Sequence, residues 1–409
     1  MGCIAGRLPW HAGSAVTAVC APPSSLSDGI RVVIKSHRWR SELTYARNSK
    51  KGSPTSVGAE EFSLCIRRGL NAGTTALFPP KTAAILLCTI PTFCHCSELG
   101  SVSKPHNILS PHEAPMHLST HNWMRAEPLE TTLARIKGLG YESIEISGEP
   151  TQYPTAPTKA LLKQHAIRCW GAVTLTLGER NLAAKDPTQR ANSVAYVKSV
   201  VQMVSELDGE IITIVPATVG KVVPDSTPEN EWTWVRDGLK EVYELADRLG
   251  VRMAIEPLNR FETYFLNRAD QALALADAVG PKCGVCLDAF HMNIEEKNFL
   301  DAIRNTGSRI YDFHVADNNR LAPGQGTLDW KAIVSTLKSV GYNGALTAEF
   351  VAPVDRTPVS PYPDQLEKNP VNISPEQLKF IQDHGSSVLS EEFYTSLVAQ
   401  TASTLRPLI

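Results

Sequence analysis

The feature that most constrains the fold is a regular alternation of short apolar segments and longer amphipathic segments, which begins at Met116 and runs almost to the C-terminus. Each apolar segment has the length of a β-strand and carries Val, Ile and Leu on both faces, as strands of a helix-covered parallel sheet do. Each is followed by a stretch with helical periodicity. The expected strands cover residues 116–120, 141–147, 169–177, 211–217, 251–258, 283–290, 309–317 and 344–351.

Eight such β-α units in about 290 residues predict a closed (β/α)₈ TIM barrel. A doubly wound open sheet is the alternative, but it usually has a glycine-rich phosphate loop after its first strand, and the sequence has none there. Glycines follow several expected helices, where a left-handed C-terminal cap would place them. These expected caps are Gly140, Gly250, Gly280, Gly307 and Gly341.

Residues 1–115 have a different composition from the rest of the chain. They contain twice as many basic as acidic residues and hold six of the nine cysteines, without a sustained period of 2 or 3.6. This pattern predicts a disordered extension. Two alternatives stay open, namely an organellar import signal in residues 1–50 and a true start at Met116. The expected domains are therefore the extension, 1–115, and the catalytic barrel, 116–409.

The overall charge and hydropathy exclude some classes of partner. The formal net charge is −2, which gives no indication of a nucleic-acid or membrane surface. The longest apolar run, residues 82–94, contains Pro91 and is too short to cross a bilayer. We therefore expect a cytoplasmic enzyme, with organellar import as the alternative. The sequence leaves a homo-oligomer open.

Metal-binding side chains end four successive expected strands. Glu256 ends the fifth strand, Asp288 the sixth, His314 the seventh and Glu349 the eighth. Because TIM-barrel chemistry occurs at the carboxyl ends of the strands, these four side chains should converge. Three carboxylates held together repel one another, and a divalent cation removes that cost. Oxygen-rich ligation suits Mn²⁺, with Mg²⁺ and Co²⁺ as alternatives.

Other polar residues near strand ends do not form such a series. A single strand-end glutamate is often a salt-bridge partner, and it is the coincidence of four on consecutive strands that favours a metal site. Glu145 ends the second strand alone, so we expect it to be structural or to support the ligands from behind. His117 and His121 flank the first strand, and a structural or solvent-facing role is expected for both.

Four segments resemble the ketose 3-epimerases of the tagatose and psicose type, within the xylose-isomerase-like sugar phosphate isomerase/epimerase superfamily. They are "IEPLNRFETYFLNR", "CLDAFHMNIEEKNF", "FHVADNNRLAPGQGTLDW" and "ALTAEF", and the resemblance spans residues 116–353. It implies that Glu256, Asp288, His314 and Glu349 bind the metal and that Glu256 and Glu349 are also the catalytic acid/base pair. It further implies that Glu262, His291 and Arg320 hold the sugar.

The implied activity is a metal-dependent inversion of a hydroxyl-bearing carbon next to a ketone. One carboxylate removes the acidified proton, giving an enediolate, and the other returns a proton to the opposite face. The expected partner is a ketose or a ketose phosphate. An aldose–ketose or hydroxypyruvate-type isomerase could use the same groups. Two remoter alternatives are an apurinic endonuclease-like nuclease, which would need a histidine-rich zinc cluster, and a non-catalytic sugar-binding barrel, which would lack one of the two glutamates.

Overall fold

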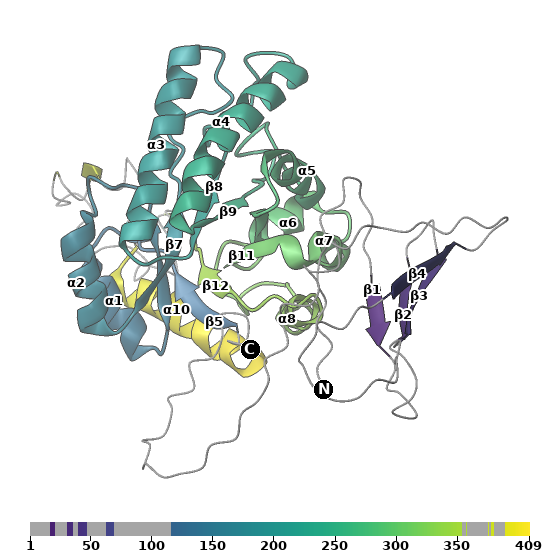
Figure 1. Cartoon of the computed structure of the whole chain (residues 1–409). Coiled ribbons are helices and arrows are strands. Elements are labelled where there is room, and N and C mark those ends of the chain that lie inside the picture. The colour runs from purple at the N-terminus through teal and green to yellow at the C-terminus, as the bar shows by residue number, and fades with distance from the viewer. Residues whose placement is uncertain are drawn as a thin grey trace, which may run out of the picture. The chain divides into compact units, whose positions relative to one another are not determined.

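The computed structural model describes residues 116–353, 357, 375, 378–379 and 389–409, together with the backbone of four strands nearer the N-terminus. The chain forms two compact units, Met1–Pro105 and His106–Ile409. In the first, the four strands form an antiparallel sheet in the order β1-β2-β3-β4, purple in Figure 1. The sequence did not predict these strands. The expectation of disorder for the remainder of 1–115 lies outside the described residues. The four strands are β1 (Thr17–Cys20), β2 (Arg31–Lys35), β3 (Arg40–Ala46) and β4 (Ser63–Arg68).

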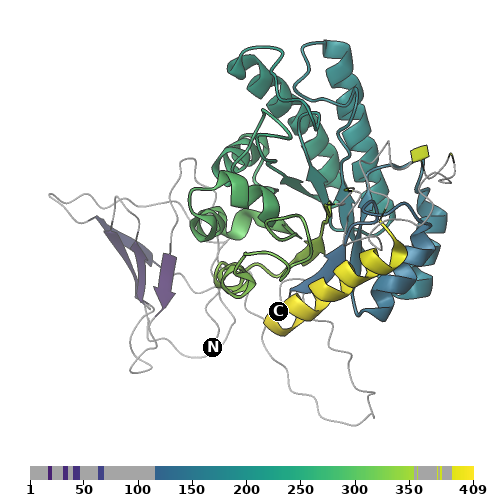
Figure 2. The same ribbon diagram turned by 180° about the vertical axis from the view of Figure 1, so that it is seen from behind.

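The second unit is built on eight parallel strands in the order β5-β12-β11-β10-β9-β8-β7-β6. A parallel bridge between His121 and Glu145 links β5 to β6, so the sheet is nearly closed, and the predicted (β/α)₈ barrel is confirmed. Helices surround the strands on the outside (Figures 1 and 2). The strands are β5 (His117–Thr120), β6 (Ser143–Ser147), β7 (Arg168–Val173), β8 (Ile211–Ile214), β9 (Arg252–Ile255), β10 (Cys283–Asp288), β11 (Ile310–Val315) and β12 (Ala345–Ala348).

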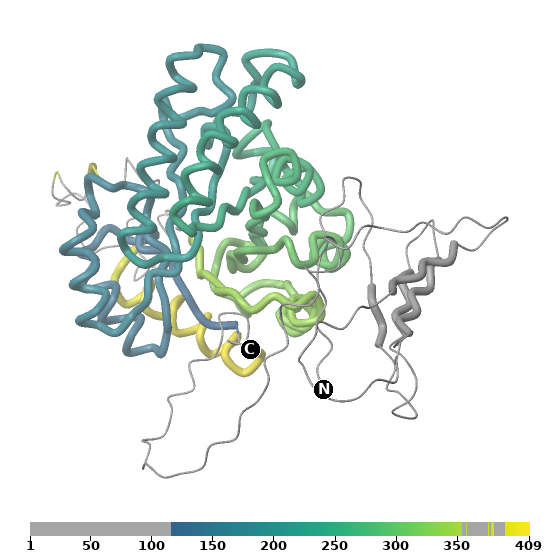
Figure 3. Tube along the Cα trace, in the orientation of Figure 1, coloured from purple at the N-terminus to yellow at the C-terminus, as the bar shows by residue number. Residues whose placement is uncertain are grey.

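A helix follows each strand, and the chain passes around the barrel in sequence order (Figure 3). One short helix, α6, was not expected and begins directly where β10 ends. Among the described residues, no helix has both the length and the apolar character needed to span a membrane. The helices are α1 (Leu129–Gly138), α2 (Thr155–His165), α3 (Pro187–Glu206), α4 (Pro228–Leu249), α5 (Ala269–Val279), α6 (Ala289–Glu295), α7 (Phe299–Thr306), α8 (Trp330–Ser339) and α10 (Glu391–Leu405).

The five glycines expected at helix ends lie at or next to such ends, and four of them have positive φ. The backbone at Gly140, Gly250, Gly307 and Gly341 has positive φ, which glycine adopts without strain. Gly280 was expected to do the same, but its φ is 173°, an extended conformation open to any residue. Its small size matters instead, because a Cβ there would lie 2.6 Å from the ring of Tyr243.

The last helix, α10 (yellow in Figures 1 and 2), packs beside α1 on the outside of the barrel. Arg135 on α1 forms an ion pair with the buried carboxylate of Glu127, and its Nε donates to Thr395 Oγ1 on α10 at 2.8 Å. The Tyr141 hydroxyl donates to the Val398 carbonyl at 2.9 Å. Residues at the C-terminal end of the chain therefore complete the layer of helices around the first strands.

A β-bulge between β6 and β7 turns one large side chain into the barrel. Ile144 pairs with Cys169 and Glu145 with Gly171, so Trp170 is the extra residue. Trp170 is 3% exposed, and its indole N–H donates to the Asp312 carboxylate at 3.1 Å. The bulge thus brings a hydrogen-bond donor beneath the carboxyl ends of the strands.

The glycine at this bulge is predicted to be essential for stability. In Gly171→Ala the added Cβ would lie 2.2 Å from the Ile211 carbonyl oxygen on β8, and backbone cannot move aside cheaply. We expect a loss of about 1–3 kcal/mol in the free energy of unfolding, measured by urea denaturation. Gly138→Ala is the control, because no atom lies within 4 Å of its Cβ position, and it should be neutral or gain up to about 1 kcal/mol. Equal stability of the two variants would contradict the prediction.

Candidate metal centre and active site

Four expected metal ligands lie at the carboxyl ends of four neighbouring strands. Asp288 is the last residue of β10 and stands opposite His314 in the ladder with β11. Glu256 and Glu349 come directly after β9 and β12, and their N–H groups still bond to the adjacent strand at 2.9 and 3.1 Å. Each is therefore fixed by sheet hydrogen bonds rather than by a mobile loop.

The four side chains converge on one point. One donor atom from each lies within 4.8 Å of the others, and none of the four is more than 8% exposed. His314 Nδ1 is 3.1 Å from Glu256 Oε1 and 3.1 Å from Glu349 Oε2. Two ligand atoms on opposite sides of a divalent cation of about the size of Mn²⁺ lie about 4.2–4.6 Å apart. The four donor atoms therefore fit within one coordination sphere. Its donors, three carboxylates and one imidazole, suit a divalent cation.

The pKa values of the four side chains show how their charges compensate one another. Burial lowers the pKa of His314, but the surrounding acidic groups outweigh this and raise it well above its usual range. Burial raises the pKa of Asp288 well above normal, and it raises that of Glu256. Burial also opposes ionisation of Glu349, yet the adjacent His314 holds its pKa well below normal. A protonated imidazole thus supplies the positive charge that an ion would otherwise provide.

The "DAFH" segment connects the four-residue cluster to helix α6. Asp288 is the N-cap of α6, and its Oδ1 accepts from the backbone N–H of His291 at 2.9 Å. Its Oδ2 lies 3.3 Å from Nη1 of Arg320. The same carboxylate therefore belongs to the metal cluster and anchors the helix that brings His291 to the mouth of the barrel.

The three expected sugar-binding residues form one rim beside the cluster. Arg320 Nη2 is 3.4 Å from His291 Nε2 and 3.9 Å from Glu262 Oε1. The guanidinium also lies over the Phe290 ring, 4.3 Å from its centre. The structure therefore brings together all seven residues selected from the sequence.

Asn259 determines the tautomer of His291, and sequence reasoning missed it. The backbone N–H of Asn259 points at His291 Nδ1 at 3.2 Å, and its side-chain amide lies 2.8 Å from the same atom. A backbone N–H can only donate, so Nδ1 is the acceptor and the proton is on Nε2. Burial and Arg320 lower the pKa of His291 well below its usual value, which keeps the ring neutral. His291 Nε2–H and Arg320 Nη2 are then two donors that lie 3.4 Å apart and cannot bond to each other.

Arg320 is held in place by a turn that depends on Asp317. The backbone of Arg320 has φ 61°, a conformation that residues other than glycine rarely adopt. The Asp317 carboxylate stabilises the turn by accepting from the Gly324 N–H and the Trp330 indole, each at 2.9 Å. A Cβ at Gly326 would lie 2.1 Å from Asp317 Oδ1, so only glycine fits there.

Behind the cluster lies a second group of polar residues around His314. Glu145 Oε2 is 3.2 Å from His314 Nε2, and Asp312 Oδ2 is 3.6 Å from the same nitrogen. Sequence reasoning missed Asp312, although Asp312 and His314 alternate along β11 and so face the same side. The solvent-facing option for His117 and His121 was wrong, because they are 4% and 0% exposed.

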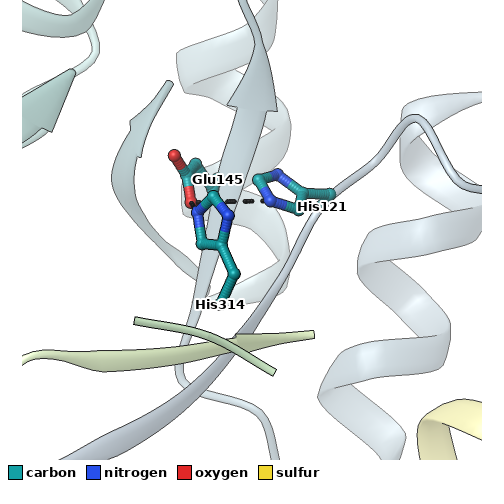
Figure 4. Close-up of side chains that lie close together, drawn as sticks. All are labelled: His121, Glu145 and His314. Atoms are coloured by element: carbon teal, nitrogen blue, oxygen red, sulfur yellow. Dashed lines mark hydrogen bonds and ion pairs between the residues drawn. The ribbon is translucent and has the colours of Figure 1, made fainter. Parts of the chain in front are cut away.

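Figure 4 shows how His121 and Glu145 flank His314. Burial, followed by the charge of Asp312, raises the pKa of Glu145 to about 8. Burial, followed by His314, lowers the pKa of His121 to about 3, so its imidazole is neutral. His117 lies elsewhere, with its Nε2 2.9 Å from Ser143 Oγ.

Comparison with known proteins agrees with this fold. Residues 133–384 match the xylose isomerase-like TIM barrel family. The D-psicose 3-epimerase of Ruminiclostridium cellulolyticum is 31% identical over 225 residues, which are 53% of this chain and 76% of that protein. The 3-dehydro-D-guloside 4-epimerase of Escherichia coli is 28% identical over 224 residues, 52% of this chain and 84% of that protein.

Solved structures show the same fold. A D-psicose 3-epimerase from Clostridium cellulolyticum H10, crystallised with D-tagatose, aligns with a TM-score of 0.59 at 23% identity, covering 72% of this chain and 99% of that one. The fold and the matched sequence define a barrel enzyme of the isomerase class. This chain belongs to the xylose isomerase-like TIM barrel family. Its relatives are sugar epimerases, which supports the activity that the sequence implied.

Proposed function

We propose that this protein is a divalent-metal-dependent ketose 3-epimerase that acts on free ketoses. The observation that carries the proposal is the position of Glu256 and Glu349, each 3.1 Å from the same imidazole nitrogen, beside a rim with two converging donors. The relatives' names support the position of the reaction, because a ketose 3-epimerase and a 3-dehydro-sugar 4-epimerase both invert a carbon next to a ketone.

The ion would be held by Glu256, Asp288, His314 and Glu349, with Mn²⁺ the best match for the oxygen-rich donors. When bound, it would supply Lewis acidity to the ketone and stabilise charge on the substrate oxygens. Each glutamate has two carboxylate oxygens, so one oxygen could bind the ion while the other accepts or donates a proton.

The side chains of this chain account for the inversion. One glutamate removes the C3 proton, the C–H electrons move into the carbonyl to give an enediolate, and the other glutamate delivers a proton to the opposite face. Glu256 and Glu349 follow strands that are three positions apart in the sheet, so they can approach a substrate from different sides. His291 Nε2–H and Arg320 donate to a sugar oxygen and fix its orientation.

The charges around the mouth favour a substrate without phosphate. Arg320 lies within ion-pair distance of Asp288, Glu262 and Glu349. Arg260 on the neighbouring loop is paired with Glu295 at 2.7 Å. In the described part of the rim, these arginines are already neutralised by carboxylates, so a phosphate would have to displace an existing partner. We therefore infer a free ketose.

Solvent-deuterium exchange tests this function. The protein is loaded with Mn²⁺ and incubated in D₂O with free ketohexoses, ketopentoses, their phosphates and hydroxypyruvate, and the label is located by NMR. We expect deuterium at C3 of a free ketose together with its C3 epimer. Label at C1 would instead identify an aldose–ketose isomerase, and the absence of exchange with every substrate would refute the proposal.

His291→Ala should separate sugar binding from metal binding. Removing the imidazole takes away one of the two converging donors, so we expect KM for the ketose to rise and kcat to fall, with bound Mn²⁺ unchanged. His165→Ala, on the outer helix α2, is the control and should leave both constants unchanged. Loss of Mn²⁺ from His291→Ala, measured by elemental analysis, would place His291 among the metal ligands and contradict its assigned role.

The expected domain boundary is tested by truncation. We propose that a chain starting at Met116 folds and keeps full metal-dependent activity, because all eight barrel strands and all seven selected residues lie beyond it. Thermal unfolding and initial rates of truncated and full-length protein provide the measurement. An insoluble or inactive truncated chain, beside active full-length protein, would show that residues 1–115 support the barrel.

A further inference from the structure

A second cluster of metal-binding side chains lies behind the first and shares His314 with it. His121 follows β5, Glu145 is on β6 and His314 is on β11, and Figure 4 shows the three side chains facing one another. Glu145 Oε2 is 3.2 Å from His314 Nε2 and 3.8 Å from His121 Nε2. All three side chains are fully buried. Donor atoms 3–4 Å apart have the spacing of neighbouring ligands on one ion with bonds of about 2.0–2.2 Å.

Several polar atoms of this cluster have no hydrogen-bond partner within the described part of the chain. They are both ring nitrogens of His121 and Oε1 of Glu145. Buried polar atoms are nearly always paired, and an imidazole with neither nitrogen satisfied is unusual. The first metal site does not account for these atoms, since neither His121 nor Glu145 belongs to it.

The charged groups around His314 are also compatible with a bound cation. Glu145 and Asp312 are both fully buried, and His314 lies within ion-pair distance of both. In the described structure, the only cationic groups within that distance of Glu145 are His121 and His314. A cation bound between His121, Glu145 and His314 would therefore have carboxylates beside it and would not be an unpaired buried charge.

We propose that His121, Glu145 and His314 form a second divalent-cation site, joined to the first through the imidazole ring of His314. This rests on the first ion site proposed above. Nδ1 of His314 faces the first ion and Nε2 the second, so the ring releases its N–H protons to solvent when both ions bind. Two imidazole nitrogens and one carboxylate suit Zn²⁺ or Co²⁺ better than Mn²⁺, in contrast to the oxygen-rich first site.

The test is the number of ions bound by full-length protein. Metal-free protein is loaded with Zn²⁺ or Co²⁺, passed through a desalting column and assayed by elemental analysis. We expect two ions per chain in the native protein and one in His121→Asn. His117→Asn is the matched control, because His117 is a buried imidazole at the start of β5 with its Nε2 near Ser143 Oγ, and this variant should keep two ions. Glu256→Gln combined with Asp288→Asn should keep one, bound at the second site.

The visible spectrum of the Co²⁺ protein gives an independent readout. A site with two histidines and few ligands absorbs more strongly than a six-coordinate, oxygen-rich site, so His121→Asn should lose the stronger bands. One ion per native chain would overturn the proposal and leave Glu145 as a hydrogen-bond acceptor for His314. Two ions in His121→Asn would overturn it as well. Ketose exchange by a protein that never binds more than one ion, even with excess Zn²⁺ or Co²⁺, would refute this inference while the proposed function stands.

Discussion

Glu256→Gln and Glu349→Gln are each expected to lower kcat by roughly 10²- to 10⁴-fold, the usual contribution of a positioned acid or base. The amide keeps an oxygen near the ion but cannot accept a proton. Ketose binding should persist, because His291 and Arg320 are untouched. Initial rates with each epimer, together with equilibrium binding of the sugar, provide the measurement.

The losses should also be asymmetric between the two variants. In the proposed mechanism each epimer presents its C3 proton to a different glutamate, so a variant that lacks one base should still exchange the proton of the other epimer with solvent. Glu295→Gln is the control, because Glu295 pairs with Arg260 and belongs to neither metal cluster. If both variants exchange deuterium at the rate of the unmodified protein, the two glutamates serve only as ligands.

Removal of the ion is expected to abolish turnover and to lower the melting temperature together. An ion that binds only the folded protein stabilises it by about 4 kcal/mol when its free concentration is about 1,000 times Kd. For a domain of this size the loss corresponds to a decrease on the order of 10 °C. Without the ion, His314 and Arg320 are the nearest positive groups to the carboxylates, and holding them charged in a buried site is costly.

The measurement compares chelated, desalted protein with the same sample after Mn²⁺ is returned. Mn²⁺ should restore both the melting temperature and the activity. Asp288→Asn serves as a second comparison, because its melting temperature should respond less to added Mn²⁺ than that of the native protein. Unchanged stability and activity after exhaustive chelation would remove the metal from the mechanism.

The barrel could be predicted from the sequence because each unit has its own local signal. Strands such as 211–214 are apolar apart from one threonine, and helices such as α4 are amphipathic and end at a glycine. A single polar residue after an apolar run, such as Glu256, could be assigned to the mouth of the barrel, because strand ends in a parallel barrel converge there. The regular geometry of the fold thus made the convergence of four side chains of ligand type predictable without knowledge of any contact.

The rest of the site depends on contacts that the sequence does not encode locally. Asn259 sets the tautomer of His291 across 32 residues, and Glu145 meets His314 across 169. His121 looked like an ordinary strand-flanking histidine, because its burial depends on the closing of β5 against β6. Gly280 caps α5 as expected but with an extended backbone, and the close approach of Tyr243 from the preceding helix could not be predicted from the sequence.

The double role of the Asp288 carboxylate has a thermodynamic consequence. It belongs to the ion cluster, and its Oδ1 caps the helix that carries His291, the proposed sugar-binding residue. An ion that immobilises this carboxylate also orders the helix, so ion and sugar each favour the same arrangement of His291. By thermodynamic linkage, if the bound ion increases the affinity for the sugar by some factor, the bound sugar increases the affinity for the ion by the same factor. The resting enzyme would then lose its ion most readily when no substrate is bound, and substrate would protect it from chelators.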